Sequence, residues 1–265
     1  MSKVPCFEIR RGDAPLIISV PHLGTEIPED LRRLYTPAAL ELVDTDWHLD
    51  RLYGFADELN ATVLNATISR YVVDLNRPAS GESLYPGLIT TSLCPTETFR
   101  GEAIYVDDKV PSGDEIERRV DAYWRPYHDA LRTEISRLRG RHQKVLLWEA
   151  HSIASLLPRL FSGRLPDFNF GTADGHSCDE GVMSGAIAAI KKTGYSWVLN
   201  GRFKGGFITR RYGQPDAGVH AIQLELAQST YMEESAPFRW RGELADRVSP
   251  TVRSVIEGAL DQVIK

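Results

Sequence analysis

The sequence has few of the features that mark several large classes of protein. Its three cysteines (Cys6, Cys94 and Cys178) are far apart and lack Cys-x-x-Cys spacing, which argues against a disulfide scaffold and favours reduced thiols. No apolar run approaches the roughly 18 residues needed to span a bilayer. No basic segment followed by an apolar one opens the chain, so a secretory leader is not indicated. We therefore expect a cytoplasmic protein that does not bind membranes.

Positive charge is also in deficit. The chain has 31 Lys and Arg against 36 Asp and Glu, a net charge of −5, which argues against binding to nucleic acid or anionic membranes. Neither a nucleotide-binding glycine motif nor the Gly-x-Ser-x-Gly elbow of many serine hydrolases is present. What remains is a chain of 265 residues, 42% hydrophobic, without repeats or linkers. This composition predicts a single globular domain over residues 1–265 with one large core.

Two apolar runs are each followed by a histidine. Leu16–Val20 precedes His22, and Lys144–Trp148 precedes His151. Such runs are typical of strands buried on both faces of a sheet, and ligands bind beyond the carboxyl ends of parallel strands. The sequence predicts an α/β fold with a mixed, mostly parallel sheet flanked by helices. The two histidines indicate a metal site or a catalytic dyad, the alternative being two hydrogen-bonded histidines near the core.

A third metal ligand has two candidates. Asp46 belongs to an acidic cluster, Asp44–His48, at the start of a predicted helix over Asp46–Leu59, and Glu26 lies four residues after His22. Catalytic zinc usually takes three protein ligands and keeps one position open. Capping of the helix explains the acidic cluster equally well. Histidine and carboxylate ligands suit zinc best but also accept iron, manganese or cobalt.

A second group of polar residues follows a predicted short strand over Tyr71–Asp74. The strand is followed by Asn76 and Arg77, which offer an amide and a planar guanidinium for recognising a carboxylate. The alternative is a surface ion pair between Arg77 and Asp74 within a turn.

Two further segments carry polar side chains suited to a site. The paired glycines Gly205-Gly206 permit close backbone approach, and the arginines that follow indicate an anionic ligand, with a solvated hairpin as the alternative. Alternating polarity in the predicted strand His220–Leu226 places Gln223 and Glu225 on one face. A glutamate on a buried strand is costly unless it is paired or used, which makes Glu225 a candidate general base.

Two further helices and one long irregular segment are predicted in the rest of the chain. A long amphipathic helix is predicted over Asp114–Arg139, with Asp114 as its N-cap, and a last helix over Arg241–Ala259 with a break at Pro250. Residues 78–113 are rich in Pro, Gly, Ser and Thr, and we expect a long irregular segment that forms a lid or binding loop.

Taken together, these motifs resemble the N-formylglutamate amidohydrolase family over nearly the whole chain. The matching segments are Pro21–Gly24, Asp44–His48, Arg70–Pro78, Glu149–Ser152, Gly206–Arg210 and Gln223–Glu225. The family is similar in fold to zinc-dependent exopeptidases, and the Asp-Leu-Asn-Arg run that ends at Arg77 resembles their substrate-carboxylate motif. The carboxypeptidases among them place a glutamate three residues after the first histidine, where this chain has Thr25, so Asp46 is preferred to Glu26.

The resemblance implies hydrolysis of N-formyl-L-glutamate to formate and L-glutamate, the last step of one route of histidine degradation. It implies one divalent metal ion, zinc, held by His22, Asp46 and His151. Glu225 would then act as the general base for a metal-activated water.

The same resemblance implies a binding site for the two carboxylates of a small-molecule substrate. It assigns Asn76, Arg77, Thr209 and Arg210 to substrate binding, and Arg70 to a substrate carboxylate or to the oxyanion. The alternatives are an amidohydrolase for another N-acyl acidic amino acid and a non-catalytic protein that binds acidic metabolites. Whether the protein forms an oligomer is left open by the sequence.

Overall fold

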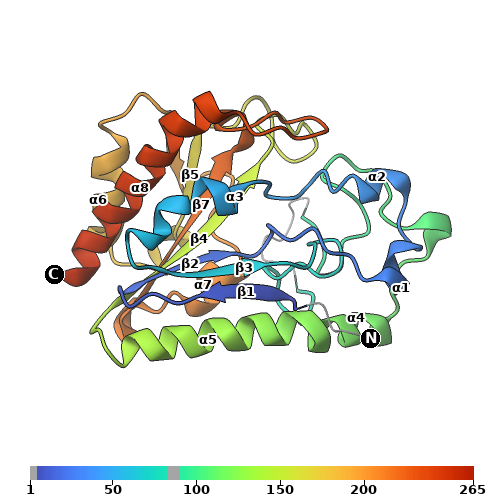
Figure 1. Cartoon of the computed structure of the whole chain (residues 1–265), viewed down its shortest axis with the longest axis horizontal. Helices are drawn as coiled ribbons and strands as arrows, with labels where there is room; N and C mark the ends of the chain where they lie inside the picture. Colours follow the sequence, from blue (N-terminus) through green and yellow to red (C-terminus); the bar gives the residue numbers. More distant parts are fainter. Residues whose placement is uncertain (1–4, 83–89) are drawn as a thin grey trace.

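The fold is built on one seven-stranded mixed sheet with helices on both faces (Figure 1). The computed structural model describes residues 5–82 and 90–265. The strand order is β1-β3-β2-β4-β7-β5-β6, in which β3, β2, β4 and β7 are mutually parallel. β1 and β5 pair antiparallel with this central group, and β6 runs parallel to β5. The strands are β1 (Phe7–Arg10), β2 (Leu16–Val20), β3 (Thr62–Ala66), β4 (Val145–Ile153), β5 (Phe168–Gly171), β6 (Trp197–Leu199) and β7 (Val219–Ala227). The predicted fold class is confirmed.

The helices are divided between the two faces of the sheet. α6 and α8 pack on one face, and α5 runs along the other (Figure 1). The α-helices are α1 (Glu29–Arg32), α2 (Pro37–Leu40), α3 (Leu49–Leu52), α4 (Gly113–Arg119), α5 (Arg125–Arg139), α6 (Glu180–Ile190), α7 (Phe207–Tyr212) and α8 (Gly242–Ile264). Short 3₁₀ turns lie at Gly54–Asp57, Val106–Asp108, Ala173–Gly175, Pro215–Ala217 and Gln228–Thr230.

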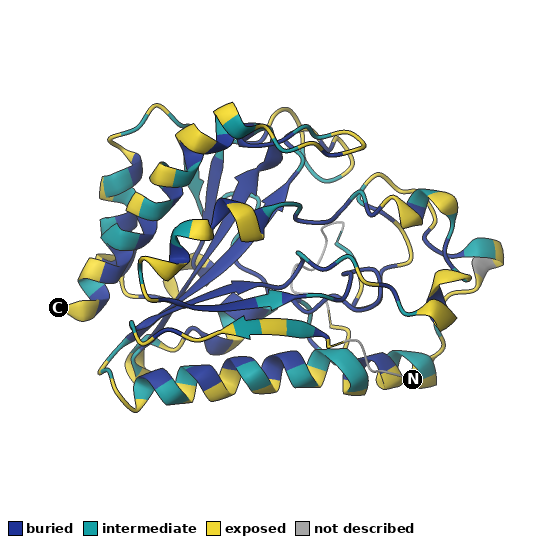
Figure 2. Cartoon of the chain, in the orientation of Figure 1, coloured by how far each residue is buried: buried dark blue, intermediate teal, exposed yellow. Residues whose placement is uncertain are grey.

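The continuous apolar runs form the central strands because both faces of the sheet are covered. Side chains alternate between the faces, so Leu16 and Ile18 join the core beneath α6 and α8, whereas Ile17 joins the core beneath α5. All five residues of β2 and all nine of β4 are buried, and the strands appear almost uniformly dark blue in Figure 2. Burial on both faces removes the need for polar alternation.

The long predicted helix is interrupted by one π turn. α4 is capped by Ser112 rather than Asp114, since the Ser112 hydroxyl accepts a hydrogen bond from the Glu115 amide at 3.3 Å. Val120–Trp124 forms the π turn, and α5 follows it. Pro126 lies in the first turn of α5 and has no amide hydrogen for the regular i to i−4 ladder, which accounts for the change of helical register.

Two other predicted elements are shorter than expected. The helix expected over Asp46–Leu59 is limited to α3 and a 3₁₀ turn, because His48 has a left-handed backbone with φ 63° and starts the helix late. The strand predicted at Tyr71–Asp74 is absent; the chain turns there, and the Val72 amide donates to the Ser69 carbonyl at 2.9 Å.

The last helix is longer than predicted. α8 continues through Pro250 to Ile264, so the predicted break is wrong. Pro250 removes one backbone hydrogen bond. The apolar face of the helix, which includes Val248, Val252 and Val255, remains fully buried across that position, and packing outweighs the lost bond.

The cysteines, the helices and the segment 78–113 can also be compared with the sequence analysis within the described residues. All three cysteines are free and buried. Across residues 5–82 and 90–265, no helix has both the length and the apolar character required to cross a membrane. In the segment 78–113, the described parts are irregular apart from one 3₁₀ turn, a few isolated β-bridges and Gly113, which begins α4, and residues 83–89 lie outside the described residues.

A buried histidine under α5 gives a first testable prediction. The imidazole of His128 lies 2.9 Å from both the Tyr212 hydroxyl and the Leu75 carbonyl, and burial, aided by Arg132 and Arg211, lowers its pKa to about 3. Between the unfolded pKa of about 6.5 and this value, the unfolded chain binds a proton that the folded chain does not. His128 therefore makes the free energy of unfolding fall by about 1.4 kcal/mol per pH unit as the pH drops through that window.

Chemical denaturation of His128→Gln at pH 7, 5.5 and 4.5, in the presence of a chelator, tests this expectation. The variant should lose stability less steeply with acidification than the wild type. His176→Gln, at an exposed position, should keep the wild-type slope. Parallel curves for the wild type and His128→Gln would contradict a neutral buried His128.

Candidate active site

The candidate site lies at the carboxyl ends of β2 and β4. In the sheet, β2 lies between β3 and β4, so the connections from β2 and β3 lead to opposite sides of β2. Open α/β sheets form their ligand crevices at such a change of direction. His22 lies just beyond β2, whereas His151 lies within β4 because that strand extends to Ile153. Glu225 on β7 is the register neighbour of His151.

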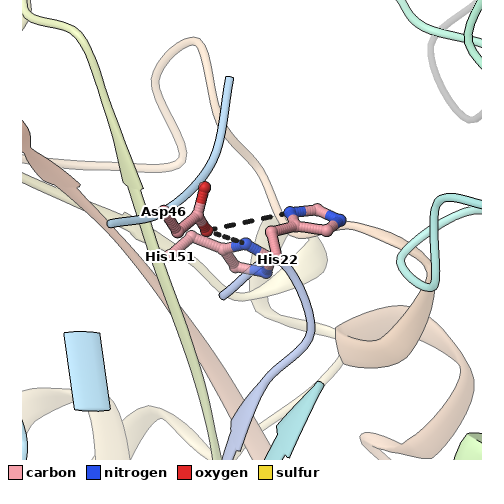
Figure 3. Close-up of side chains that lie close together, drawn as sticks. All are labelled: His22, Asp46 and His151. Carbon is pink, nitrogen blue, oxygen red and sulfur yellow. Dashed lines mark hydrogen bonds and ion pairs between the residues drawn. The ribbon is translucent and has the colours of Figure 1, made fainter. Parts of the chain in front are cut away.

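Two histidines and an aspartate converge at this edge of the sheet (Figure 3). His22, Asp46 and His151 are buried, and their ligand atoms lie within 4.8 Å of one another. Oδ2 of Asp46 is 3.1 Å from Nδ1 of His151 and 3.7 Å from Nδ1 of His22. The Asp46 amide donates to the His22 carbonyl at 3.0 Å, which fixes the loop that carries the carboxylate. Of the two alternatives for a third ligand, the structure brings Asp46 to the histidines and leaves Glu26 exposed.

A buried aspartate lies behind the first histidine. Oδ1 of Asp74 is 2.7 Å from Nε2 of His22, and its other oxygen accepts a hydrogen bond from Nη2 of Arg70 at 2.8 Å. Asp74 is fully buried, so its interpretation as the partner of Arg77 in a surface ion pair is wrong. Sequence reasoning missed this contact. The available signal was an acid directly after the apolar run Tyr71–Val73, where a solvated residue is unusual.

A second buried carboxylate lies behind His151. Oε1 of Glu149 is 3.3 Å from Nε2 of His151 and accepts a hydrogen bond from the Ser19 hydroxyl at 3.4 Å. That hydroxyl is in turn 2.8 Å from the hydroxyl of Tyr127 on α5. Oε2 of Glu149 has no hydrogen-bond partner among the described residues. The sequence motif contained Glu149, but no role was assigned to it.

The buried charges of the site differ in their effects on the two histidines. Burial, followed by the charge of Arg70, lowers the pKa of His22 to about 4. Burial also acts to lower the pKa of His151, but hydrogen bonds and charges from Asp46 and Glu149 outweigh it and raise that pKa to about 10. Burial raises the pKa of Glu225 to about 8. Carboxylates therefore dominate around His151, and the site favours an added positive charge.

A pocket opens directly onto this cluster. Its wall includes six of the predicted site residues: His22, Arg70, Asn76, Arg77, His151 and Glu225. Gln223, on the same face of β7 as Glu225, lines it too, as the alternating pattern predicted. Loops add Thr90, Thr91, Phe99, Arg202 and Phe203, which sequence reasoning did not identify. The described part of the segment 78–113 thus contributes to the wall.

The glycine-rich segment is arranged differently from the prediction. Thr209 and Arg210 are not among the residues that line the pocket. Both lie on α7, which follows the glycines directly, so the solvated hairpin given as the alternative is not formed either. The Thr209 side chain is buried within the fold, and Nε of Arg210 donates to the Gly205 carbonyl at 2.8 Å.

Close backbone approach at Gly206 is confirmed, and its neighbour is Asn76. A Cβ atom at Gly206 would lie 2.3 Å from the amide nitrogen of Asn76, so only glycine fits. The Asn76 carbonyl oxygen accepts from the Ile208 amide at 2.9 Å, which orients the side chain so that its nitrogen lies 3.0 Å from Nε2 of His151. Gly206 also donates its amide to Gln223 at 2.7 Å.

Comparisons with known proteins place the chain among N-formylglutamate amidohydrolases. The model of the N-formylglutamate amidohydrolase family matches residues 14–232. The N-formylglutamate deformylase of Pseudomonas putida is 48% identical over 262 residues, which cover 98% of this chain and 97% of that protein. The enzyme of the same name from Pseudomonas aeruginosa is 49% identical over 253 residues, which cover 95% and 94% of the two chains.

Solved structures support the same relationship. The crystal structure of N-formylglutamate amidohydrolase from Ralstonia eutropha superposes with a TM-score of 0.81 at 26% identity and covers 97% of both chains. A protein from Agrobacterium tumefaciens has the same fold, with a TM-score of 0.75 at 16% identity, and the match covers 100% of this chain and 98% of that one. From the family match and the two full-length relatives together, the chain belongs to the N-formylglutamate amidohydrolase family.

Proposed function

We propose that this enzyme hydrolyses N-formyl-L-glutamate to formate and L-glutamate, using one zinc ion held by His22, Asp46 and His151. The convergence of these three side chains beside Glu225, at a pocket whose wall also carries arginines, is the observation that carries the proposal. The two Pseudomonas relatives are N-formylglutamate deformylases, which supports this substrate. A dicarboxylate substrate also explains why a protein of net charge −5 has several arginines at its site.

The donor set suits a divalent cation such as zinc. Two imidazoles and one carboxylate are ligands that zinc prefers, and three protein ligands leave a position open for reaction. Nδ1 of both His22 and His151 faces Asp46, while their Nε2 atoms face Asp74 and Glu149. Carboxylates placed in this way hold the tautomer that presents the opposite ring nitrogen to a metal. When bound, the ion supplies Lewis acidity that polarises the formyl carbonyl and acidifies water.

Glu225 is proposed as the general base. Its carboxylate takes a proton as the oxygen of water bonds to the formyl carbon, and it returns this proton to the amide nitrogen as the C–N bond breaks. Burial raises the pKa of Glu225, and a divalent cation nearby favours its ionised form. Because these two effects on its pKa oppose each other, the Glu225 carboxylate is ionised at neutral pH and still has enough proton affinity to accept a proton from water.

The remaining polar residues of the pocket bind and stabilise the substrate in this proposal. Arg70 is buried, and its positive charge faces the pocket beside the metal-binding side chains, where it offsets negative charge that develops on the formyl oxygen. Arg77 and Asn76 hold a substrate carboxylate through charge-assisted hydrogen bonds.

Formate release from N-formyl-L-glutamate, measured with metal content on the same sample, tests the proposal. We expect about one zinc per chain, activity that chelation removes, and recovery when zinc is returned. Activity that persists without metal would contradict the proposed cofactor. Bound metal without formate release would contradict the substrate, and N-acetyl and N-succinyl derivatives of glutamate and aspartate would then identify the acyl amino acid.

A further inference from the structure

Neither metal binding nor proton transfer uses the buried side chain of Gln223. This residue lies on β7, lines the pocket and is only 4% exposed. Its side-chain oxygen accepts a hydrogen bond from the Gly206 amide at 2.7 Å, whereas its nitrogen, Nε2, donates to none of the described residues. Nε2 is not sealed inside the protein in the way that the unpartnered polar atoms of the core are. Its N–H groups are therefore accessible from the pocket.

The backbone just before α7 determines which end of the Gln223 amide meets the pocket. An amide oxygen only accepts hydrogen bonds, and an amide nitrogen only donates them. Because the Gly206 amide is a donor, the oxygen of Gln223 faces it and Nε2 points elsewhere. The flipped amide would place two donors against each other and leave the buried Gly206 amide without an acceptor, which is costly. Gln223 therefore presents donors, and no acceptor, to a ligand.

Asn76 is oriented by the same segment and in the same sense. Its side-chain oxygen accepts a hydrogen bond from the Ile208 amide at 2.9 Å. Gly206 also packs closely on this side chain, since a Cβ atom there would lie 2.6 Å from the Asn76 oxygen. One backbone turn, residues 206–208, thus holds the oxygens of two pocket-lining amides and turns both nitrogens away from α7. A pair of amides held in this way suits a ligand rich in acceptors.

The register of the sheet indicates which part of the substrate Gln223 can meet. In β7, Glu225 is paired with His151, and Gln223 is paired with Glu149. Gln223 is therefore two residues, or about 7 Å, further from the carboxyl edge of the sheet than the proposed general base. The formyl group reacts beside Glu225 and the metal-binding side chains. The other acceptors of N-formyl-L-glutamate are its two carboxylates, so a carboxylate is the group to expect at Gln223.

We propose that Gln223 is a substrate-binding residue, which donates a hydrogen bond from Nε2 to a carboxylate oxygen of the substrate. This inference rests on the proposed deformylase function and adds a binding residue to it. A hydrogen bond to a charged acceptor stabilises a complex more than one between neutral groups. Because Gly206 occupies the oxygen of Gln223, a ligand that presents a donor at this position finds no acceptor there and is rejected.

Two substitutions separate the donor from the rest of the side chain. Gln223→Met keeps the length and removes the donor, so KM for N-formyl-L-glutamate should rise about 10–100-fold while kcat stays near the wild-type value. Gln223→Glu keeps an oxygen for the Gly206 amide and replaces the donor with an acceptor, so KM at pH 8 should rise further. Zinc content should be unchanged in both variants. Gln214→Glu, at an exposed position outside the pocket, is the matched control.

Two monoamides of the substrate identify the carboxylate that meets Gln223. N-formyl-L-glutamine lacks the side-chain carboxylate and N-formyl-L-isoglutamine lacks the α-carboxylate, and each can be assayed as a substrate or as a competitive inhibitor. The compound without the contacted carboxylate should be weakened least by Gln223→Met, and the other should be weakened as much as N-formyl-L-glutamate. An equal loss for all three compounds would contradict a carboxylate contact, because it would indicate a general distortion of the pocket.

The inference and the proposed function fail in different ways. If the wild type releases formate and Gln223→Met keeps the wild-type KM, Gln223 does not bind the substrate and the deformylase function stands. If the wild type releases no formate, the proposed function fails, and calorimetric titration with L-glutamate still tests the carboxylate contact. Weaker binding to Gln223→Met than to the wild type would support the contact, whereas equal binding, or no binding to either protein, would overturn it.

Discussion

Glu225→Gln should lower kcat by about 10²–10⁴-fold while KM and metal content stay near their wild-type values. Glutamine has almost the same shape as glutamate, so substrate binding and the fold should persist, but an amide cannot accept the proton of an attacking water. Glu225 is buried on β7 beside His151 and lines the pocket, yet it is not one of the three clustered ligand residues. Steady-state formate release and zinc analysis of the same preparation measure both expectations.

A matched control is available in α8. Glu257 lies outside the pocket on the surface of the helix, and its ion pair with Arg253 at 2.9 Å is partly exposed, so Glu257→Gln should keep wild-type kinetics. Wild-type kcat in Glu225→Gln would show that another group accepts the proton. Zinc loss that accompanies the loss of activity would instead make Glu225 a metal ligand and exclude it as the base.

The sheet and its two histidines could be predicted because local sequence determines them. Leu16–Val20 is apolar without interruption, and only a strand covered on both faces buries all five side chains. Once two such strands are parallel neighbours, topology brings the residues at their carboxyl ends together, which is how His22 and His151 meet. Glu225 followed from the period of two in its strand, since Gln223 and Glu225 both line the pocket.

The residues that support the histidines could not be predicted in this way, because their partners are distant in sequence. Asp74 is 52 residues from His22, and the local pattern around Asp74 fits a surface turn equally well. Ser19, which donates to Glu149, is 130 residues from it. Arg202 reaches the pocket from a loop with no regular period, whereas Arg210, which belonged to a recognisable motif, lies on α7 outside the wall. Contacts between segments that are distant in sequence determine where these side chains lie, and local sequence patterns do not report such contacts.

Loss of a metal-ligand histidine should also lower the activity by a large factor, as the loss of Glu225 does. We expect His22→Ala to bind zinc so weakly that it is purified without metal and releases formate at least ~10³-fold more slowly than the wild type. Asp74→Asn should be milder, with zinc affinity reduced by about 10–100-fold, because it weakens the hydrogen bond to Nε2 of His22 and keeps the ligand. Competition with a chromogenic chelator measures the affinities, and His176→Ala, at an exposed position, is the control.

The response to added zinc separates a ligand from the residue that positions it. Excess zinc should restore most activity to Asp74→Asn, since a weakened site fills by mass action, but it should restore little to His22→Ala, whose site lacks a donor. Zinc should likewise raise the Tm of the wild type and of Asp74→Asn and leave that of His22→Ala unchanged. If His22→Ala retained wild-type zinc affinity, the metal could not lie between His22, Asp46 and His151. The buried carboxylates around His151 would then need another cation to balance their charge.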